Sequence, residues 1–305
     1  MSDTEANQPA HKATLMRSAT YAAMAVAGLL IVIKGYAWLL SDSVAMLSSL
    51  VDSILDALAS VINFVAVRHA LMPPDREHRF GHGKAEALAG LGQAAFIGGS
   101  AVFLLFQAGH RLIRPQPVDN GAVAVTVLVL SILVTLGLVV FQRYVVRKTG
   151  SLAISADQLH YKTDLLVNLG IIAGLLAVTG LGWHFVDPLV AALVAGYILW
   201  SAFSIVRDSF DHLMDREFDD DERARVVAIA KTHAEVRNIH DLRTRSSGVQ
   251  KFIQLHLELD GGLTLARAHE IADQVELMIA EAFPGAEVII HQDPAGLDEN
   301  HPVFS

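Results

Sequence analysis

Residues 44–71 read VAMLSSLVDSILDALASVINFVAVRHAL, a run long and apolar enough to cross a bilayer although it contains two aspartates. A hydrocarbon core about 30 Å thick needs about 20 predominantly apolar residues per helical span. Comparable runs occur elsewhere in the chain, at roughly 15–40, 85–110, 121–146, 152–180 and 184–207. The sequence therefore predicts an all-α membrane domain of six helices. An even number of spans places both chain termini on the same side of the membrane.

Composition supports a membrane protein and narrows the ligands available to it. The 305 residues are 52% hydrophobic and 18% charged, with no cysteine and a mean hydropathy of +0.41. These values exclude a disordered, collagen-like or disulfide-stapled chain. Without thiolates, soft ions such as Cu(I) are disfavoured, so any bound metal must be held by imidazole and carboxylate groups.

Charge is distributed unevenly along the chain. Residues 209–305 contain 19 acidic and 9 basic residues, whereas residues 1–208 contain 13 acidic and 14 basic residues. The net charge of −9 therefore arises from the C-terminal segment, because the acidic and basic residues of the rest of the chain nearly balance. An acidic segment that also carries histidines is a poor match for nucleic acid and a reasonable one for cations.

The distribution of basic residues near the span ends predicts the orientation in the membrane. Residues 1–13 are polar and lack the pattern of a signal peptide, so we expect a cytoplasmic N-terminal tail. Only Arg111 and Arg114 flank spans on the opposite side. By the positive-inside rule both termini are cytoplasmic. The basic residues on the N-terminal side are Lys12, Arg17, Arg68, Arg76, Arg79, Lys84, Arg143, Arg147 and Lys148.

After the six-span domain, residues 14–208, the pattern becomes that of a water-soluble α+β domain over residues 209–305. The stretch 252–260 alternates strictly, with Ile253, Leu255, Leu257 and Leu259 on one face, which is typical of a half-buried strand. Acidic residues at 219–222 suit the start of a helix. The predicted order is αββαβ, with helices at 219–235 and 264–283 and strands at 239–246, 252–260 and 286–292.

Ionisable residues within two spans indicate a metal site inside the membrane. Such groups are costly there and normally face a partner or an aqueous cavity. Asp52 and Asp56 are separated by four residues, as are His160 and Asp164, so each pair lies on one helix face. With a rise of about 1.5 Å per residue, Asp52 and Asp56 lie about 12 and 18 Å from the outer membrane surface. His160 and Asp164 lie about 12 and 18 Å from the cytoplasmic surface, so all four are near the middle of the membrane. Three carboxylates and one imidazole suit a tetrahedral divalent ion such as Zn²⁺.

A purely structural alternative stays open for these residues. The carboxylates could form a polar cluster stabilised by hydrogen bonds or by Lys162, with no ion. Asp157 shares a face with His160 and could be an entrance carboxylate, although an interfacial charge is the interpretation we favour. Lys34, near the end of the first run, is expected to snorkel to the membrane surface.

Two further groups of residues have metal-ligand chemistry outside the membrane. The loop PPDREHRFGHGK at 73–84 offers Asp75, His78 and His82, for which simple solvation is the competing interpretation. The acidic C-terminal segment carries more histidines than a small core requires, and isolated surface histidines are the alternative there. Its candidate ligands are His240, His256, His269, His291 and Asp293.

Taken together, these stretches resemble the cation diffusion facilitator family, in particular its bacterial branch of zinc and ferrous-iron efflux pumps. The resemblance extends from about residue 15 to residue 294. The motifs that carry it are LVDSILD at 50–56, DREHRFGHGKAE at 75–86, HYKTD at 160–164, HDLRTRSSG at 240–248, FIQLHLEL at 252–259, ADQVE at 272–276 and VIIHQDP at 288–294.

The resemblance implies roles for matching positions. The two intramembrane pairs become the transport site, the loop residues become a second metal site, and the five C-terminal candidates become a two-metal cluster in a metallochaperone-like domain. It further implies a homodimer in a bacterial inner membrane, and a charge interlock between Lys84 and Asp215 that joins the membrane and soluble parts.

The expected function is export of Zn²⁺, with Cd²⁺ and Fe²⁺ as further candidates, in exchange for protons by alternating access. Zn²⁺ would also be the regulatory ligand of the soluble domain. One alternative is a membrane-anchored metal sensor without transport, and another is the same transporter with Fe²⁺ or Mn²⁺ as its main substrate. An enzyme is not expected, since HYKTD lacks the general-base glutamate of an HExxH metalloprotease. Lipid, protons and a second copy of the chain are the expected partners, and nucleic acid is not.

Overall fold

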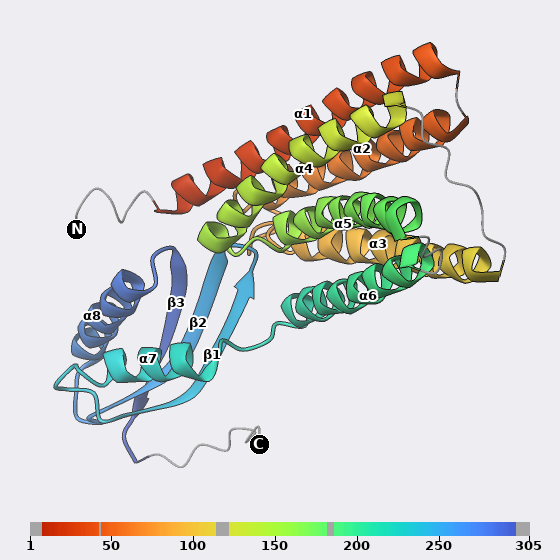
Figure 1. The fold of residues 1–305 in the computed structure, drawn as a ribbon. Coiled ribbons are helices and arrows are strands. Elements are labelled where there is room, and N and C mark those ends of the chain that lie inside the picture. The colour runs from red at the N-terminus through yellow and green to blue at the C-terminus, as the bar shows by residue number, and fades with distance from the viewer. Residues whose placement is uncertain (1–7, 43, 114–121, 182–185, 297–305) are drawn as a thin grey trace. The chain divides into compact units, whose positions relative to one another are not determined.

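The computed structural model describes residues 8–42, 44–113, 122–181 and 186–296 (Figure 1). The described residues separate into two compact units, which divide between residues 211 and 212. The first unit contains six long helices in its described part. They are α1 (Gln8–Ser41), α2 (Val44–Ala70), α3 (Ala85–Ile113), α4 (Ala122–Thr149), α5 (Leu152–Leu181) and α6 (Val186–Leu213).

The helices of the first unit have the length and composition of membrane spans. Within the described residues, five contain a sufficiently long apolar segment, at Ala10–Ser41, Ser49–Ala70, Ala85–His110, Val125–Thr149 and Leu189–Leu213. Helix α5 is 30 residues long, but its first half carries Asp157, Lys162 and Asp164. The predicted helical membrane domain is therefore confirmed, and the first half of α5 places several charged residues within it.

Buried polar contacts fasten the first half of α5 to its neighbours. The Tyr161 hydroxyl lies 2.8 Å from Ser60 Oγ of α2 and donates to the Ala23 carbonyl of α1 at 3.3 Å. A buried hydroxyl in contact with two other helices defines both the depth and the rotation of α5. The candidate ligands on α5 are thus presented by a helix that is held against α1 and α2.

Asp157 occupies the interior of the bundle and is fully buried. Its carboxylate accepts hydrogen bonds from Gln142 Nε2 of α4 at 2.6 Å and from Gln93 Nε2 of α3 at 3.4 Å. The interpretation of Asp157 as an interfacial charge is therefore wrong. Helices α3 and α4 pack over this side chain, and the spacing of residues along α5 does not contain that information.

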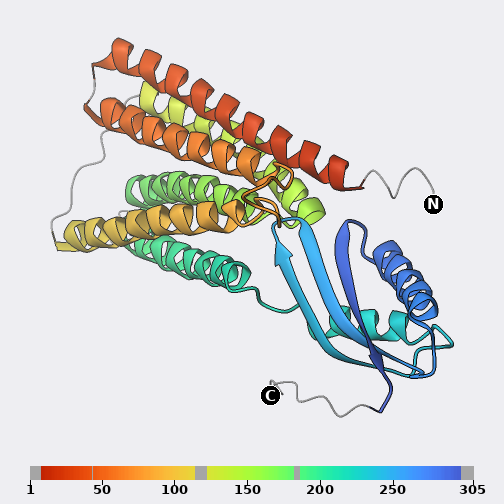
Figure 2. The same cartoon turned by 180° about the vertical axis from the view of Figure 1, so that it is seen from behind.

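The second unit is a small α+β domain with the predicted αββαβ order. Its elements are α7 (Asp220–Ala230), β1 (Asn238–Ser247), β2 (Gln250–Leu259), α8 (Leu265–Ala282) and β3 (Ala286–Pro294). Strand β2 is central, antiparallel to β1 and parallel to β3. Both helices cover one face of the sheet, where Ile253, Leu255 and Leu257 are buried. Figure 2 shows the sheet from the side opposite to that in Figure 1.

Local sequence signals explain the ends of the two helices in this unit. The Asp219 side chain caps α7 by accepting from the Glu222 amide at 2.8 Å, and Thr264 caps α8 in the same way. Helix α7 ends at Ala230, five residues before the predicted end. The amides of Thr232 and His233 turn back to carbonyls three residues earlier, which ends the helical hydrogen-bond pattern.

Candidate metal sites

The structure brings together three of the four intramembrane candidates. His160 Nε2 lies 3.0 Å from Asp56 Oδ1 and 3.8 Å from Asp164 Oδ2. Ligand atoms of these three residues all lie within 4.8 Å of one another. Ligands around a tetrahedral ion with bonds of about 2.0–2.1 Å are separated by about 3.4 Å. Small side-chain adjustments would therefore be enough for these three groups to share one divalent ion.

Asp52 lies apart from this set of three ligands. It is one helical turn from Asp56, and its side chain is exposed in the isolated chain. Two carboxylates on one helix face repel each other when no cation lies between them. Asp52 therefore remains a predicted fourth ligand, which would join the set by a change of side-chain rotamer.

Two lysines of the membrane unit, Lys34 and Lys162, have specific partners. Lys34 Nζ donates to Ser53 Oγ at 2.7 Å and to the Ser49 carbonyl at 3.3 Å. The snorkelling expectation for Lys34 is wrong, because α2 supplies these acceptors next to α1. Lys162 donates instead to the Tyr197 hydroxyl of α6. The alternative in which Lys162 neutralises the cluster therefore has no support among the contacts of the described residues.

The loop between α2 and α3 forms a second compact group. Asp75 Oδ1 lies 3.4 Å from His78 Nδ1, and Asp75 Oδ2 lies 3.2 Å from His82 Nε2. Backbone amides of His78 and Glu77 donate to the Asp75 carboxylate, and the His78 amide contributes most to holding its pKa below the ordinary value. Asp75 therefore stays ionised, and hence able to bind a cation, to lower pH than an ordinary aspartate.

His82 differs from the other two loop residues in being buried. Its ring lies 4.6 Å from that of His78 and 4.7 Å from that of His69, measured between centroids. His69 lies at the end of α2 and so beside the loop group, although its ligand atoms are not part of the set of three.

The third group lies on the face of the sheet that α7 and α8 leave uncovered. His240, His256 and His291 occupy matching positions on β1, β2 and β3. The buried carboxylate of Asp293 reaches all three imidazoles, at 3.4 Å from His240, 2.8 Å from His256 and 3.1 Å from His291. Strand pairing thus assembles residues that are up to 53 positions apart in the sequence. Nitrogen and oxygen ligands in this arrangement fit a borderline divalent ion.

Two acidic residues next to this group were not among the predicted ligands. Glu258 Oε1 lies 3.0 Å from His240 Nδ1, and its place on the polar face of β2 was the available signal. Asp241 Oδ2 lies 3.7 Å from His256 Nε2. Asp241 has a φ of +45° at a register irregularity between His240 and Arg243. A β-bulge of this kind redirects a side chain, and no simple alternation pattern reveals it.

His269 lies on α8, away from the residues of the sheet group. Its side chain is 69% exposed and lies 3.5 Å from Asp273, one turn further along the helix. Within the described residues of one chain it does not join the group of His240, His256 and Asp293. Its role as a ligand stays a prediction, and so does the pairing of Lys84 with Asp215. Asp215 forms an ion pair with Arg245 of its own unit at 3.3 Å.

Comparison with known proteins identifies the family. The family model for the cation efflux transmembrane domain matches residues 20–214. The model for the cytoplasmic domain of cation efflux proteins matches residues 218–295. The chain belongs to the cation diffusion facilitator family. Members of this family are transporters rather than enzymes, and this facilitator is accordingly a multi-pass inner-membrane protein that exports divalent cations.

Its relatives are similar along nearly the whole chain. The cation-efflux pump FieF of Shewanella oneidensis is 49% identical over 283 residues, which cover 93% of this facilitator and 95% of that protein. FieF of Klebsiella pneumoniae is 47% identical with 93% and 94% coverage. Among solved structures, the metal-bound C-terminal domain of the CzcD transporter from Thermotoga maritima is 29% identical. That match covers 26% of this chain and 93% of the domain, with a TM-score of 0.25.

Proposed function

We propose that this facilitator exports Zn²⁺ from the cytoplasm in exchange for protons, by alternating access to a site formed by Asp52, Asp56, His160 and Asp164. The proposal is carried by the convergence of Asp56, His160 and Asp164 inside the helical bundle. A sensor that transports nothing would not need ligands at that depth. The FieF name of the relatives leaves Fe²⁺ as an alternative main substrate, since oxygen-rich sites accept it as well.

Proton coupling follows from the chemistry of the ligands. Carboxylate and imidazole groups bind a metal only when deprotonated, so metal and protons compete for the same atoms. Loading from a near-neutral cytoplasm would release protons, and protons arriving from the other side would displace the metal. The contact between His160 and Asp56 at 3.0 Å is a place where a proton can be held when the metal has left. Rocking of helices around this fixed site would complete the cycle.

In the proposed arrangement both termini are cytoplasmic, and the C-terminal unit senses the metal. Binding at His240, His256, His291 and Asp293 would stabilise the conformation of that unit in which these side chains are together. We further propose a homodimer, which is supported by the match of residues 218–295 to the family's dimerisation domain. Metal on the sheet would then favour the dimer that transports.

Flux measurements in inverted vesicles test the proposed exchange. With an acidic interior, we expect Zn²⁺ to accumulate inside, and we expect dissipation of the pH gradient by a protonophore to prevent accumulation. Competition by Cd²⁺, Fe²⁺ and Mn²⁺ at equal concentrations ranks the substrates. Accumulation that is indifferent to the pH gradient would contradict antiport, and the absence of any metal flux would favour the sensor.

Lys34 allows a test of charge compensation at the transport site. Its ammonium group acts electrostatically on Asp52, Asp56 and Asp164. Because it competes with a metal ion for the same carboxylates, Lys34→Met should tighten Zn²⁺ binding about tenfold, or on the order of 1.4 kcal/mol. Binding is measured by isothermal titration at constant pH. Lys162→Met is the matched control, since Lys162 bonds to Tyr197. Equal tightening in both variants, or none in Lys34→Met, would refute this role.

A further inference from the structure

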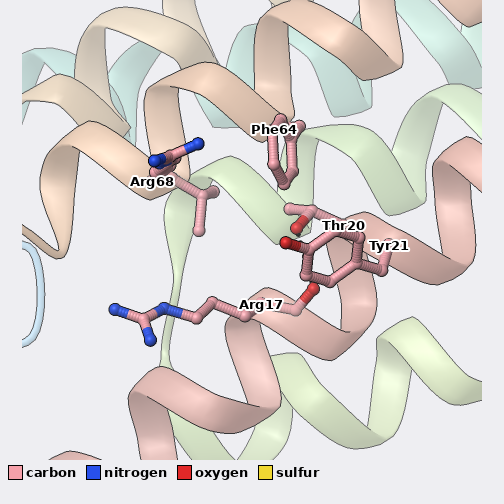
Figure 3. Close-up of a pocket in the computed structure, with 6 residues that line it drawn as sticks. Arg17, Thr20, Tyr21, Phe64 and Arg68 are labelled. Carbon is pink, nitrogen blue, oxygen red and sulfur yellow. Dashed lines mark hydrogen bonds between the residues drawn. The ribbon is translucent and has the colours of Figure 1, made fainter.

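A pocket of about 320 Å³ lies between α1 and α2, and its lining residues include no candidate metal ligand (Figure 3). Helix α1 contributes Arg17, Thr20 and Tyr21 to its lining, and α2 contributes Phe64, Val67 and Arg68. The transport mechanism uses none of these residues. Two arginines on facing helices nevertheless form an unusual wall for a pocket in a membrane protein, because like charges repel and are costly to place near hydrocarbon.

The pocket has a basic end and an aromatic end. In Figure 3 the guanidinium groups of Arg17 and Arg68 lie on one side and the rings of Tyr21 and Phe64 on the other. The two rings are in contact, with centroids 5.2 Å apart and an interplanar angle of 54°. Among the described residues, no carboxylate forms an ion pair with either guanidinium. The pocket therefore presents positive charge that the described part of the chain does not neutralise.

The position of the pocket along the helices matches the boundary between headgroups and hydrocarbon. Arg17 lies near the beginning of the apolar segment Ala10–Ser41, and Arg68 lies near the end of Ser49–Ala70. Because α1 and α2 are consecutive spans, these two ends meet at the same membrane surface. Tyr21 and Phe64 are each four residues further into the membrane, or about 6 Å deeper. Aromatic rings at this depth are typical of a membrane interface.

Exposed apolar side chains continue from the aromatic end along both helices. Tyr21 is 60% exposed, and it is followed on α1 by Leu29 and Val32. On α2 the exposed residue Val61 lies further from Arg68 than Phe64 does and continues in the same direction. A ligand that fits this surface has an anionic group at one end and a hydrocarbon chain at the other.

We propose that this pocket binds the headgroup of an anionic phospholipid. Arg17 and Arg68 hold the phosphate, which forms charge-assisted hydrogen bonds with guanidinium groups. The first part of an acyl chain lies against Tyr21 and Phe64. Basic pockets between transmembrane helices are a recognised form of lipid-headgroup site. A zwitterionic lipid binds less well, because its own ammonium group already compensates the phosphate.

Native mass spectrometry of the purified full-length protein tests this site. We expect the wild-type protein to retain phosphatidylglycerol at least about tenfold more strongly than phosphatidylcholine. The double variant Arg17→Gln/Arg68→Gln should lose this preference. The matched control is Arg143→Gln/Arg147→Gln, which removes two exposed arginines near the end of α4 and should keep it. Metal flux and melting temperature in phosphatidylcholine verify that each variant is folded.

Each of the following outcomes would contradict the proposed lipid site. Equal loss of preference in the control pair would indicate general attraction to an anionic surface. Displacement of the lipid by millimolar inorganic phosphate would indicate a site for the free ion. The absence of a preference in the wild-type protein would remove the proposal altogether. If the double variant does not fold, the single variants Arg17→Gln and Arg68→Gln are compared, and an unchanged preference in both contradicts the pocket as the site.

Discussion

Replacement of Asp56 by alanine is expected to reduce Zn²⁺ flux in proteoliposomes more than about 100-fold at every metal concentration. Loss of a hydrogen-bond partner that only orients a metal ligand already costs about 10–100-fold in metal affinity, and removal of the ligand itself should cost more. Asp56 is also the residue of α2 that contacts His160 of α5, at 3.0 Å. Without it, the imidazole loses its partner across the two helices, and the site loses negative charge that compensates a divalent ion.

Two further variants distinguish a missing ligand from a damaged fold. Asp56→Asn keeps the size of the side chain while it removes the charge, and it should be nearly as inactive as the alanine variant. Asp220→Asn alters a fully exposed carboxylate in α7 and should transport normally. Melting temperature and the dimer fraction should be similar in all three proteins. Full transport by folded Asp56→Ala would refute the proposed site.

Replacement of His256 by alanine should produce the second largest effect, on metal binding by the C-terminal unit. His256 lies between the rings of His240 and His291, with centroids 5.1 and 4.7 Å away, and contacts Asp293 at 2.8 Å. We expect the full-length variant to bind less Zn²⁺ at a given free concentration. Affinity at this site should fall about 100-fold or more, since removal of a ligand costs more than loss of a group that only orients one. The metal concentration that gives half-maximal flux should rise, while flux at saturating metal persists.

His233→Ala is the matched control for His256. His233 belongs to the same unit, but its ring lies 2.9 Å from Gln274 and outside the sheet group. Equilibrium dialysis of the full-length proteins gives the number of ions bound, and flux is followed against metal concentration. Complete loss of flux in His256→Ala would contradict a sensing role. Reduced binding in His233→Ala to the same degree would show that the sheet group is not the metal site.

The polypeptide pattern was sufficient to predict the C-terminal fold, because each of its signals is local. Alternation at 252–260 identifies the central strand, since side chains in a strand point alternately to its two faces. Ile253, Leu255 and Leu257 are buried as this pattern requires. The end of α7 was predicted less well, since it depends on turn hydrogen bonds without a glycine or proline to mark them.

Hydropathy predicted the membrane helices equally well. A membrane span must form its backbone hydrogen bonds within the helix and present apolar side chains to lipid. Spacing also placed Asp56, His160 and Asp164 on the appropriate faces at similar depth. The spacing could not show that Asp52 lies apart from the other three residues. The rotamers of neighbouring carboxylates depend on whether a cation or a proton lies between them. That charge is a property of the assembled site and not of one helix.

The sequence by itself determined which segments cross the membrane, which segment folds in water and which residue types are available to bind a metal. These properties depend on periodicity and composition over short windows. Only the tertiary structure decided that Asp157 is buried beneath Gln93 and Gln142, that Lys34 turns to α2 and that Asp293 contacts three histidines. Each of these contacts joins different helices or strands, and side-chain partners across elements depend on packing and register.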